Sequence, residues 1–320
     1  MILVTGGTGF VGTALLPALT ARGERVCVLT RRHIVAAPGV EVRTGDLLNP
    51  ATLTAALRDV TVVIHLAAAL PGPRVATTTL RRTNVEGTSN LATAAAAAGV
   101  ERFVHVSSAT VYGERADLEP ADEDTRPIAE TTYARSKLDA EHAVQIALRD
   151  TATSLVVLRP SEIHGPHREA TVRFYAQICR RPVWVHAPVT VIVHPSYVGD
   201  VVSAILLTMS RRVATGTIFN IAGAEALTYT ELIDRVAARL HVRIRQVRIP
   251  AHPTRDLARA ATTVGRLLGR SFPRLARAQR QVVNRSIDIA RARTVLGFEP
   301  YPLDAAIDAT IAVARREGRL

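Results

Sequence analysis

The stretch Thr5-Gly6-Gly7-Thr8-Gly9-Phe10-Val11-Gly12 follows a short apolar run and opens a helix-forming region that extends to about residue 23. Its three spaced glycines permit a tight turn, close approach of a pyrophosphate to backbone N–H groups, and close packing of helix on strand. The positive end of the helix favours the phosphate charge. We therefore expect a dinucleotide to contact Gly6, Gly9, Phe10, Val11 and Gly12.

Around this turn, the first 160 residues alternate short apolar runs with alanine-rich stretches of helical character. The runs are continuously apolar, which is typical of parallel strands that helices cover on both faces. Their alternation with helices predicts an α/β fold, a doubly wound parallel sheet of the Rossmann type. The expected strands cover residues 2–5, 25–30, 40–44, 62–66, 103–107 and 154–159.

From about Gly165 the pattern becomes irregular. We expect a dinucleotide-binding domain over residues 1–164 and a smaller, irregular lobe over residues 165–320 that mainly binds substrate. Some segments of this lobe should return to the first domain. Later helices are expected at residues 198–209, 230–240 and 303–315, and a strand at residues 218–221.

The composition excludes several classes of protein. With 48% hydrophobic and 21% charged residues, the chain can bury a core and lacks the signature of disorder. Cys27 and Cys179 have no CxxC or histidine-rich partner, so we expect neither disulfides nor a metal site, and a cytoplasmic location. The sequence starts almost at the first strand, and the longest apolar run is about half a membrane span, so neither export nor membrane insertion is expected.

The net charge of +12 raises nucleic acid as a partner. The densest series of arginines lies at residues 255–280, but no aromatic residues are interleaved as stacking platforms, which favours a solvated helix face. We therefore expect a small-molecule substrate and no nucleic acid. The basic residues have one odd feature: of 40 lysines and arginines, Lys137 alone is a lysine.

The end of the second expected strand bears on the choice of dinucleotide. An acidic residue there would bind the ribose 2′-OH of NAD, whereas a cation would accommodate the 2′-phosphate of NADP. The strand ends in Arg31-Arg32, with no carboxylate nearby. NADP(H) is favoured over NAD(H), with a solvated surface turn as the alternative reading of the arginine pair.

A third pattern combines Tyr133-Ala134-Arg135-Ser136-Lys137 with Ser107-Ser108, which end an expected strand. On a helix, residues four apart share a face, so Tyr133 and Lys137 can point at one ligand. A phenol with a pKa of about 10 is a poor acid or base at neutral pH, but a neighbouring ammonium stabilises the phenolate. Tyr133 is thus a candidate general acid or base, and a serine could hold the substrate oxygen beside it.

Taken in order, TGGTGFVG, GDL at Gly45, HLAA at His65, NVEGT at Asn84, SSATVYG and YARSK resemble the extended short-chain dehydrogenase/reductase family. The likeness continues through Leu158-Arg159-Pro160 and Phe219-Asn220-Ile221, so it covers essentially the whole chain. It implies Tyr133 as acid or base, Lys137 on the nicotinamide ribose, and Ser108, rather than Ser107, at the reacting oxygen. By the same resemblance, the remaining cofactor contacts are Asp46, Leu47, Ala67, Ala68, Asn84 and Pro160.

The resemblance leaves the reaction open between a reductase and an epimerase. Sugar-nucleotide dehydratases carry Asp-Glu where Ala109-Thr110 stand, which argues against dehydration. Residues 165–194 lack the insertion that nucleotide-sugar epimerases use. The apolar runs Val183-Trp184-Val185 and Val189-Thr190-Val191-Ile192-Val193 suggest an apolar wall, with a core strand as the alternative for the second run. We expect an NADP-dependent ketoreductase acting on an apolar carbonyl compound of secondary metabolism; the alternatives are an epimerase that retains NAD(P) and a non-catalytic NADP-binding sensor. Candidates for substrate contact are Thr110, His164 and Trp184.

Relatives commonly dimerise through two helices that correspond to residues 88–98 and 133–149 of this chain. A homodimer is therefore expected.

Overall fold

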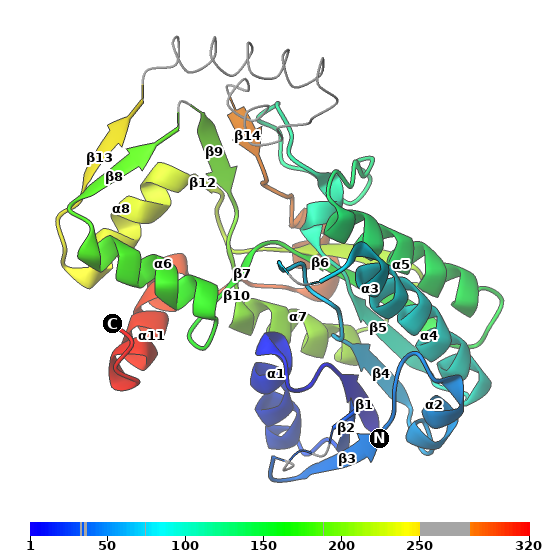
Figure 1. Cartoon of the computed structure of the whole chain (residues 1–320). Helices are drawn as coiled ribbons and strands as arrows, with labels where there is room; N and C mark the ends of the chain where they lie inside the picture. Colours follow the sequence, from blue (N-terminus) through cyan, green and yellow to red (C-terminus); the bar gives the residue numbers. More distant parts are fainter. Residues whose placement is uncertain (33, 35–36, 74, 188, 250–281) are drawn as a thin grey trace.

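The computed structural model describes residues 1–32, 34, 37–73, 75–187, 189–249 and 282–320. Its centre is a seven-stranded sheet in the order β11-β6-β5-β4-β1-β2-β3, with every neighbouring pair parallel (Figure 1). This order confirms the predicted doubly wound fold, and each expected strand lies within one residue of its observed bounds. The strands are β1 (Ile2–Thr5), β2 (Val26–Thr30), β3 (Val40–Thr44), β4 (Val62–His65), β5 (Arg102–Val106), β6 (Ser154–Pro160) and β11 (Thr217–Ile221).

Helices cover both faces of this sheet, which explains why the strands β1, β2 and β4 are almost continuously apolar, whereas the edge strand β3 reads Val-Glu-Val-Arg-Thr and is mostly not buried. On β1, Ile2 and Val4 pack into one core with α1 and α7, whereas Leu3 packs into a second core with α2, α4 and α5. The helices are α1 (Phe10–Ala21), α2 (Pro50–Ala56), α3 (Thr77–Arg81), α4 (Gly87–Ala97), α5 (Thr132–Leu148) and α7 (Val198–Ser210), with short helical segments η1 (Arg82–Glu86), η2 (Ala109–Tyr112) and η3 (Ala292–Leu296).

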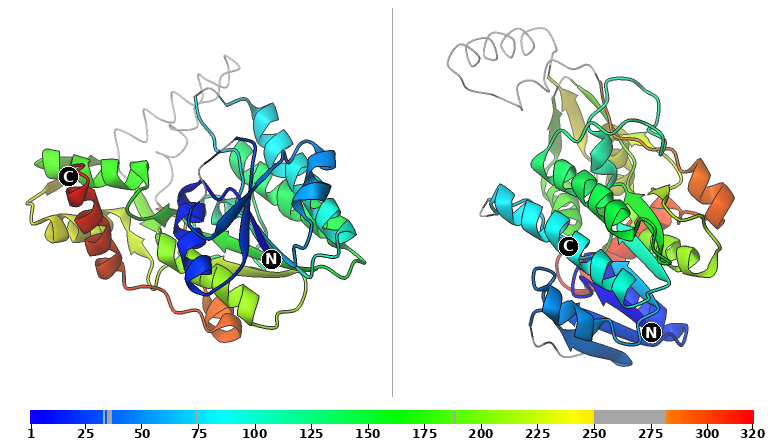
Figure 2. Two further views of the ribbon diagram at one scale, coloured as in Figure 1. Left: turned by 90° about the horizontal axis from the view of Figure 1, so that it is seen from below. Right: turned by 90° about the vertical axis from the view of Figure 1, so that its right-hand side faces the viewer.

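A smaller lobe stands beside the sheet. Its helices pack around a third core, and in the left view of Figure 2 α11, in red, lies beside α6 and away from the N-terminus. The lobe helices are α6 (Glu169–Arg180), α8 (Tyr229–Leu240) and α11 (Leu303–Arg316). Its strands are β7 (Ile163–His164) with β10 (Ser196–Tyr197), β8 (Val183–His186) with β13 (Arg245–Arg248), and β9 (Thr190–Val193) between β12 (Leu227–Thr228) and β14 (Val282–Asn284).

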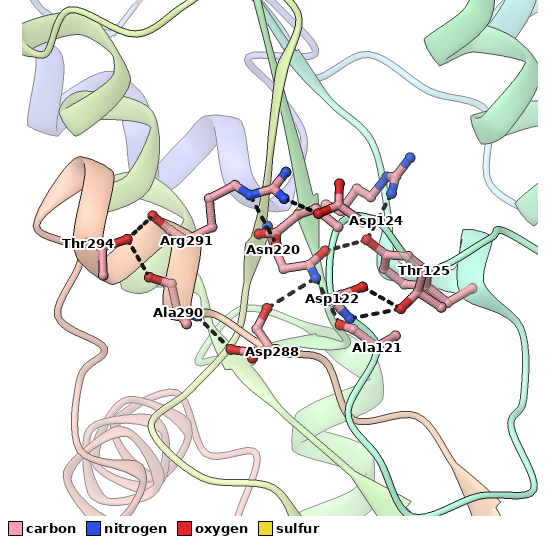
Figure 3. Close-up of polar contacts among 12 residues, drawn as sticks. Ala121, Asp122, Asp124, Thr125, Asn220, Asp288, Ala290, Arg291 and Thr294 are labelled. Carbon is pink, nitrogen blue, oxygen red and sulfur yellow. Dashed lines mark hydrogen bonds and ion pairs between the residues drawn. The ribbon is translucent and has the colours of Figure 1, made fainter.

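Asn220 of β11 joins the large sheet to distant loops (Figure 3). Its side-chain nitrogen donates to the carbonyls of Ala121, at 3.0 Å, and Asp288, at 3.1 Å, and its side-chain oxygen accepts from the Tyr112 hydroxyl at 2.8 Å. Asn220, Tyr112 and Ala121 are buried, and an unmade hydrogen bond is costly there. The edge strand is therefore tied to segments from three parts of the chain.

In the part of the chain that the structure describes, no helix combines the length and the hydropathy needed to cross a membrane. The arginine series at residues 255–280 lies outside the described residues.

Candidate active site

A cleft of about 1050 Å³ opens at the carboxyl ends of the parallel strands, where ligands bind in open α/β sheets. One half is built on the turns after β1, β2, β3 and β4, and the other on the ends of β5 and β6, on α5 and on the smaller lobe. Most of the predicted site residues line it: Gly6, Gly9, Phe10, Val11, Gly12, Arg31, Arg32, Asp46, Leu47, Ala67, Ala68, Ser108, Thr110, Tyr133, Lys137 and Pro160.

The glycine turn has the geometry of a phosphate cradle. Gly6 has a φ of +69°, and a Cβ there would lie 2.7 Å from the backbone nitrogen of Ala67. A Cβ on Gly12 would lie 2.4 Å from the carbonyl oxygen of Gly6, so the first turn of α1 packs directly on the loop. Gly9 caps α1 without a side chain, which leaves the helix N-terminus open to an anion. The residues present thus fit the dinucleotide that the motif predicts.

The arginine pair lies at the adenosine end of this half. Arg31 and Arg32 follow β2, are exposed and line the cleft. The Thr30 hydroxyl accepts a hydrogen bond from the backbone of Arg32 at 3.2 Å, which orders the turn. Neither guanidinium forms an ion pair with a described residue, so both are available to a ligand.

Ser107 and Ser108 differ in what their hydroxyls already bind. Ser107 is buried and donates to the carboxylate of Glu141. Ser108 caps η2, accepting from the backbone nitrogen of Thr110 at 3.3 Å and from its hydroxyl at 2.9 Å. The proton of Ser108 therefore stays available to a ligand oxygen, which favours the predicted choice of Ser108.

Tyr133 and Lys137 lie four residues apart on α5, whose first turn is capped by Thr131 accepting from Ala134 at 3.1 Å. The Lys137 ammonium is buried and donates to the carbonyl of Val106 at the end of β5, at 2.8 Å. Burial lowers the pKa of Lys137 to about 8, and the negative charge of Glu141 opposes this shift. A compact ammonium can bind the strand end and still present protons to the cleft.

The electrostatics of Tyr133 depart from expectation. Lys137 is expected to lower the pKa of the phenol, but burial raises this pKa, and the cation that opposes the rise is Arg168. The Lys137 amine is bound to the Val106 carbonyl, and Arg168 lines the cleft together with Tyr133.

Asn84 orders the site from behind and does not line the cleft. Its side chain accepts from the backbone nitrogen of Ala69 at 2.7 Å, donates to the Ala69 carbonyl at 3.1 Å, and donates to Ser136 of α5 at 2.9 Å. The turn after β4 is thereby fixed to the helix that carries Tyr133.

His164 and Trp184, two candidates for substrate contact, do not line this cleft. The His164 ring packs on Tyr197, with centroids 5.7 Å apart, and burial lowers its pKa to about 4. Trp184 packs edge-on against Phe174, at 5.8 Å, within the core of the lobe. Val183 and Val185 of the expected apolar wall do not line this cleft either, because β8 pairs with β13 and leaves them 43% and 59% exposed. Val193 of β9, from the second apolar run, does line it.

A buried ion pair beneath the strand ends went unpredicted. Glu141 binds Arg159 through two hydrogen bonds, at 2.6 and 3.0 Å, and Arg159 also donates to the Tyr112 hydroxyl at 2.8 Å. This pair supports Ser107 from one side and the Asn220 contacts from the other. Glu141 lies one helical turn after Lys137, so helical periodicity could have placed it on the same face.

Three arginines on the substrate side of the cleft also went unpredicted: Arg115, Arg168 and Arg285. They come from three separate loops, and no local motif marks them.

Comparison with known proteins identifies the family. The model of the NAD dependent epimerase/dehydratase family matches residues 2–222, and the chain belongs to this family. The chain is 26% identical over 309 residues to a UDP-glucose 4-epimerase of Vibrio cholerae, covering 93% of this chain and 90% of that protein. It is 31% identical to a ceramide reductase of Caulobacter vibrioides, covering 78% and 74%.

Solved structures agree with this placement. The crystal structure of gox2253 superposes with a TM-score of 0.86 at 29% identity, covering 100% of this chain and 99% of that one. MoeE5 in complex with UDP-glucuronic acid and NAD superposes with a TM-score of 0.77 at 26% identity, covering 99% of both chains. The expected membership of the extended short-chain dehydrogenase/reductase family is confirmed. The protein is accordingly a nicotinamide-dependent enzyme of the oxidoreductase or epimerase kind.

Proposed function

We propose that this member of the NAD dependent epimerase/dehydratase family is an NADP-dependent oxidoreductase that interconverts a carbonyl group and a secondary alcohol. The observation that carries the proposal is the single cleft lined by the glycine turn, Ser108, Tyr133, Lys137 and Pro160. Hydride transfer needs a cofactor cradle and an acid–base group facing one space, and these residues supply both.

The chain's own residues would act on the substrate oxygen. The Ser108 hydroxyl donates a hydrogen bond to that oxygen, and the Tyr133 phenol gives it a proton as it becomes an alcohol. Lys137, held by the Val106 carbonyl, adds positive charge below the site and donates to the cofactor ribose. When bound, the nicotinamide supplies the hydride. In the reverse direction, Tyr133 takes the proton from the alcohol.

NADP as the cofactor rests on the two arginines after β2. Both line the cleft, and no carboxylate stands at this strand end to bind a free ribose 2′-OH. NAD is the cofactor named for the related MoeE5 structure, so the proposed preference for NADP has to be tested on this chain itself.

An epimerase is the second candidate, and it is favoured by the similarity to the UDP-glucose 4-epimerase. The two reactions differ in the fate of the hydride. A reductase oxidises one NADPH for each product formed, whereas an epimerase returns the hydride to its substrate and consumes none.

The deciding experiment incubates purified protein with NADPH and a panel of ketones, and separately with UDP-glucose and no added cofactor. We expect NADPH oxidation that matches alcohol formation one for one and is lost in Tyr133→Phe. Interconversion of UDP-sugars without NADPH consumption, by protein that copurifies with a cofactor it does not release, would decide for the epimerase. If neither reaction occurs while NADPH still binds, a sensor of the cofactor is the remaining candidate.

A further inference from the structure

Two short strands of the smaller lobe present an apolar face to solvent. Strands β8 and β13 pair in parallel, with Val185 beside Val247. Successive side chains of a strand point to opposite faces, so Val183, Val185, Val247 and Ile249 share the outer one. Each of these four residues is 39–59% exposed, and none lines the cleft. They form the β8–β13 face, which lies on the side of the lobe away from the large sheet (Figure 1).

The opposite face of the two strands is anchored to the lobe. Trp184 packs edge-on against Phe174, with centroids 5.8 Å apart. The side-chain nitrogen of Gln246 donates to the carboxylate of Asp234 at 2.5 Å and to the carbonyl of Thr230 at 3.1 Å, both on α8. These contacts fix the strands against the lobe. The β8–β13 face is therefore a built surface that stays turned to solvent.

The charges around this face are all of one sign. Residues 180–187 and 241–249 contain neither aspartate nor glutamate. They contain five arginines, all exposed and none in an ion pair with a described residue: Arg180, Arg181, Arg243, Arg245 and Arg248. Arg245 stands beside Val183 in the strand register, so positive charge borders the apolar side chains directly. An exposed apolar patch with a polar rim is typical of an interaction surface.

The combination of apolar and purely cationic groups restricts the partner. A second copy of the chain would place arginines against arginines, and like charges across an interface are costly. Nucleic acid would leave the valines without contacts, and the aromatic ring of Trp184 is turned away from it. An anionic lipid surface supplies negative headgroups above a layer of hydrocarbon. Arginine can cover apolar groups with its stem while its guanidinium reaches a headgroup.

We propose that the β8–β13 face binds the surface of an anionic lipid bilayer. Val185, Val247 and Ile249 enter the boundary between headgroups and hydrocarbon, and the five arginines contact the negative headgroups. Binding of this kind requires no membrane-spanning helix, because the chain lies on one leaflet. It is independent of the reaction in the cleft.

The test is flotation of the full chain with two kinds of vesicle: phosphatidylcholine alone, and equal parts of phosphatidylcholine and phosphatidylglycerol. We expect binding to the anionic vesicles only, and weaker binding as salt is added. Arg243→Gln together with Arg245→Gln should weaken binding roughly tenfold or more, because both charges lie at the headgroups. Val185→Asp together with Val247→Asp should weaken it at least as much, because both carboxylates would face anionic lipid.

Two controls match these variants. Val295→Asp changes an apolar residue that is 48% exposed on η3, outside the β8–β13 face. Arg22→Gln together with Arg25→Gln removes two exposed charges beside α1. Both controls should bind anionic vesicles almost as well as the unchanged chain. Urea unfolding of every variant establishes that it folds, since substitutions at exposed positions should barely change stability.

Trp184 reports where the lipid contacts the chain, because it is the one tryptophan of the sequence. It lies between Val183 and Val185 on β8. Brominated phosphatidylcholine in the anionic vesicles should therefore quench its fluorescence. Val185→Asp together with Val247→Asp should remove this quenching.

Three results would overturn the proposal. The chain may fail to float with anionic vesicles, or it may float without quenching of Trp184. Binding that both variants of the β8–β13 face retain would show that another part of the chain contacts the lipid. Light scattering of the lipid-free chain tests the other occupant: a dimer that Val185→Asp with Val247→Asp dissociates would assign this face to a second copy.

Discussion

The two halves of the cleft are built in different ways. In the half that fits a dinucleotide, the surface is largely backbone: the glycine turn, the turns after β2 and β3, and the alanines after β4. In the other half, the surface is formed by side chains from separate segments: the charged Arg115, Arg168 and Arg285 together with the apolar Ile163, Val193 and Ile287. The shape of the first half is determined by the positions at which the strands end. The surface of the second half depends on which side chains the loops carry.

This difference teaches where specificity resides. A backbone cradle accepts any dinucleotide, so its selectivity is left to a few side chains at its rim, such as Arg31 and Arg32. The other half has no backbone cradle of this kind, so each substitution of a side chain there changes which substrate the cleft can bind. Variants should therefore separate cofactor effects from substrate effects.

The largest difference between the effect on turnover and the effect on cofactor binding is expected at Tyr133. Tyr133→Phe removes the proton-transfer hydroxyl and keeps the ring, so kcat should fall by about 10²–10⁴ while NADPH affinity stays unchanged. Steady-state kinetics and NADPH titration measure the two effects, with Tyr301→Phe, outside the cleft, as control. Turnover close to that of the unchanged protein would show that another group supplies the proton.

The ion pair below both halves should control stability. Glu141→Gln leaves the buried Arg159 charge without its carboxylate, and we expect a loss of roughly 3–5 kcal/mol in the free energy of unfolding. Urea unfolding measures this loss, and Glu101→Gln, at an exposed position, should cost almost nothing. The double variant Glu141→Leu with Arg159→Met should recover part of the loss, because the buried guanidinium that lost its carboxylate is then removed as well. A single variant as stable as the control would contradict the assignment.

Arg31 and Arg32, at the rim of the dinucleotide half, should determine the preference for NADPH over NADH. Replacing Arg31 and Arg32 together by alanine should weaken NADPH binding by about 1.5–3 kcal/mol and barely change NADH binding, because only NADPH carries the 2′-phosphate. Fluorescence titration gives both dissociation constants. Arg22→Ala, outside the cleft, is the control. If the unchanged protein binds both dinucleotides equally well, the arginines serve only as a surface turn.

The smallest effect is expected in the reactivity of Lys137. Its pKa of about 8 means that the neutral, nucleophilic amine forms above pH 8, well below the value of about 10.4 for a free lysine. Labelling with an amine-directed reagent should rise through pH 8 and slow when NADPH is present. Lys137→Met, which removes the one lysine of the sequence, supplies the background. A midpoint typical of exposed lysines, or no protection by NADPH, would contradict the assigned role.

The dinucleotide half of the cleft could be predicted from the sequence more fully than the substrate half. The sheet and the glycine turn could be predicted because apolar runs and spaced glycines act through their immediate neighbours in sequence. Tyr133 and Lys137 were found because four-residue spacing puts them on one helical face.

The residues that escaped prediction act over long separations. Arg115 gains its place by pairing with Asn284, and Arg168 by lying over Phe10, and neither contact has a local signal. Val183 and Val185 were expected to line the substrate site but do not, because an apolar run predicts that a strand forms and does not predict which strand pairs with it. His164 was misplaced for a related reason, since its neighbour Tyr197 belongs to a strand more than thirty residues away.

The hydrogen bonds of Asn220 have a consequence for how the chain folds during synthesis. Strand β11 forms one edge of the large sheet, yet it is synthesised after α6, β8 and β9 of the smaller lobe. Tyr112, which donates a hydrogen bond to Asn220 of β11, lies 108 residues earlier in the chain. A nascent chain ending near residue 164 would leave the outer edge of β6 unpaired and the sheet face beneath α7 uncovered, a surface prone to association. We therefore expect that the dinucleotide half does not fold on its own, so that expression of a chain truncated at the lobe boundary yields aggregates rather than a smaller soluble domain.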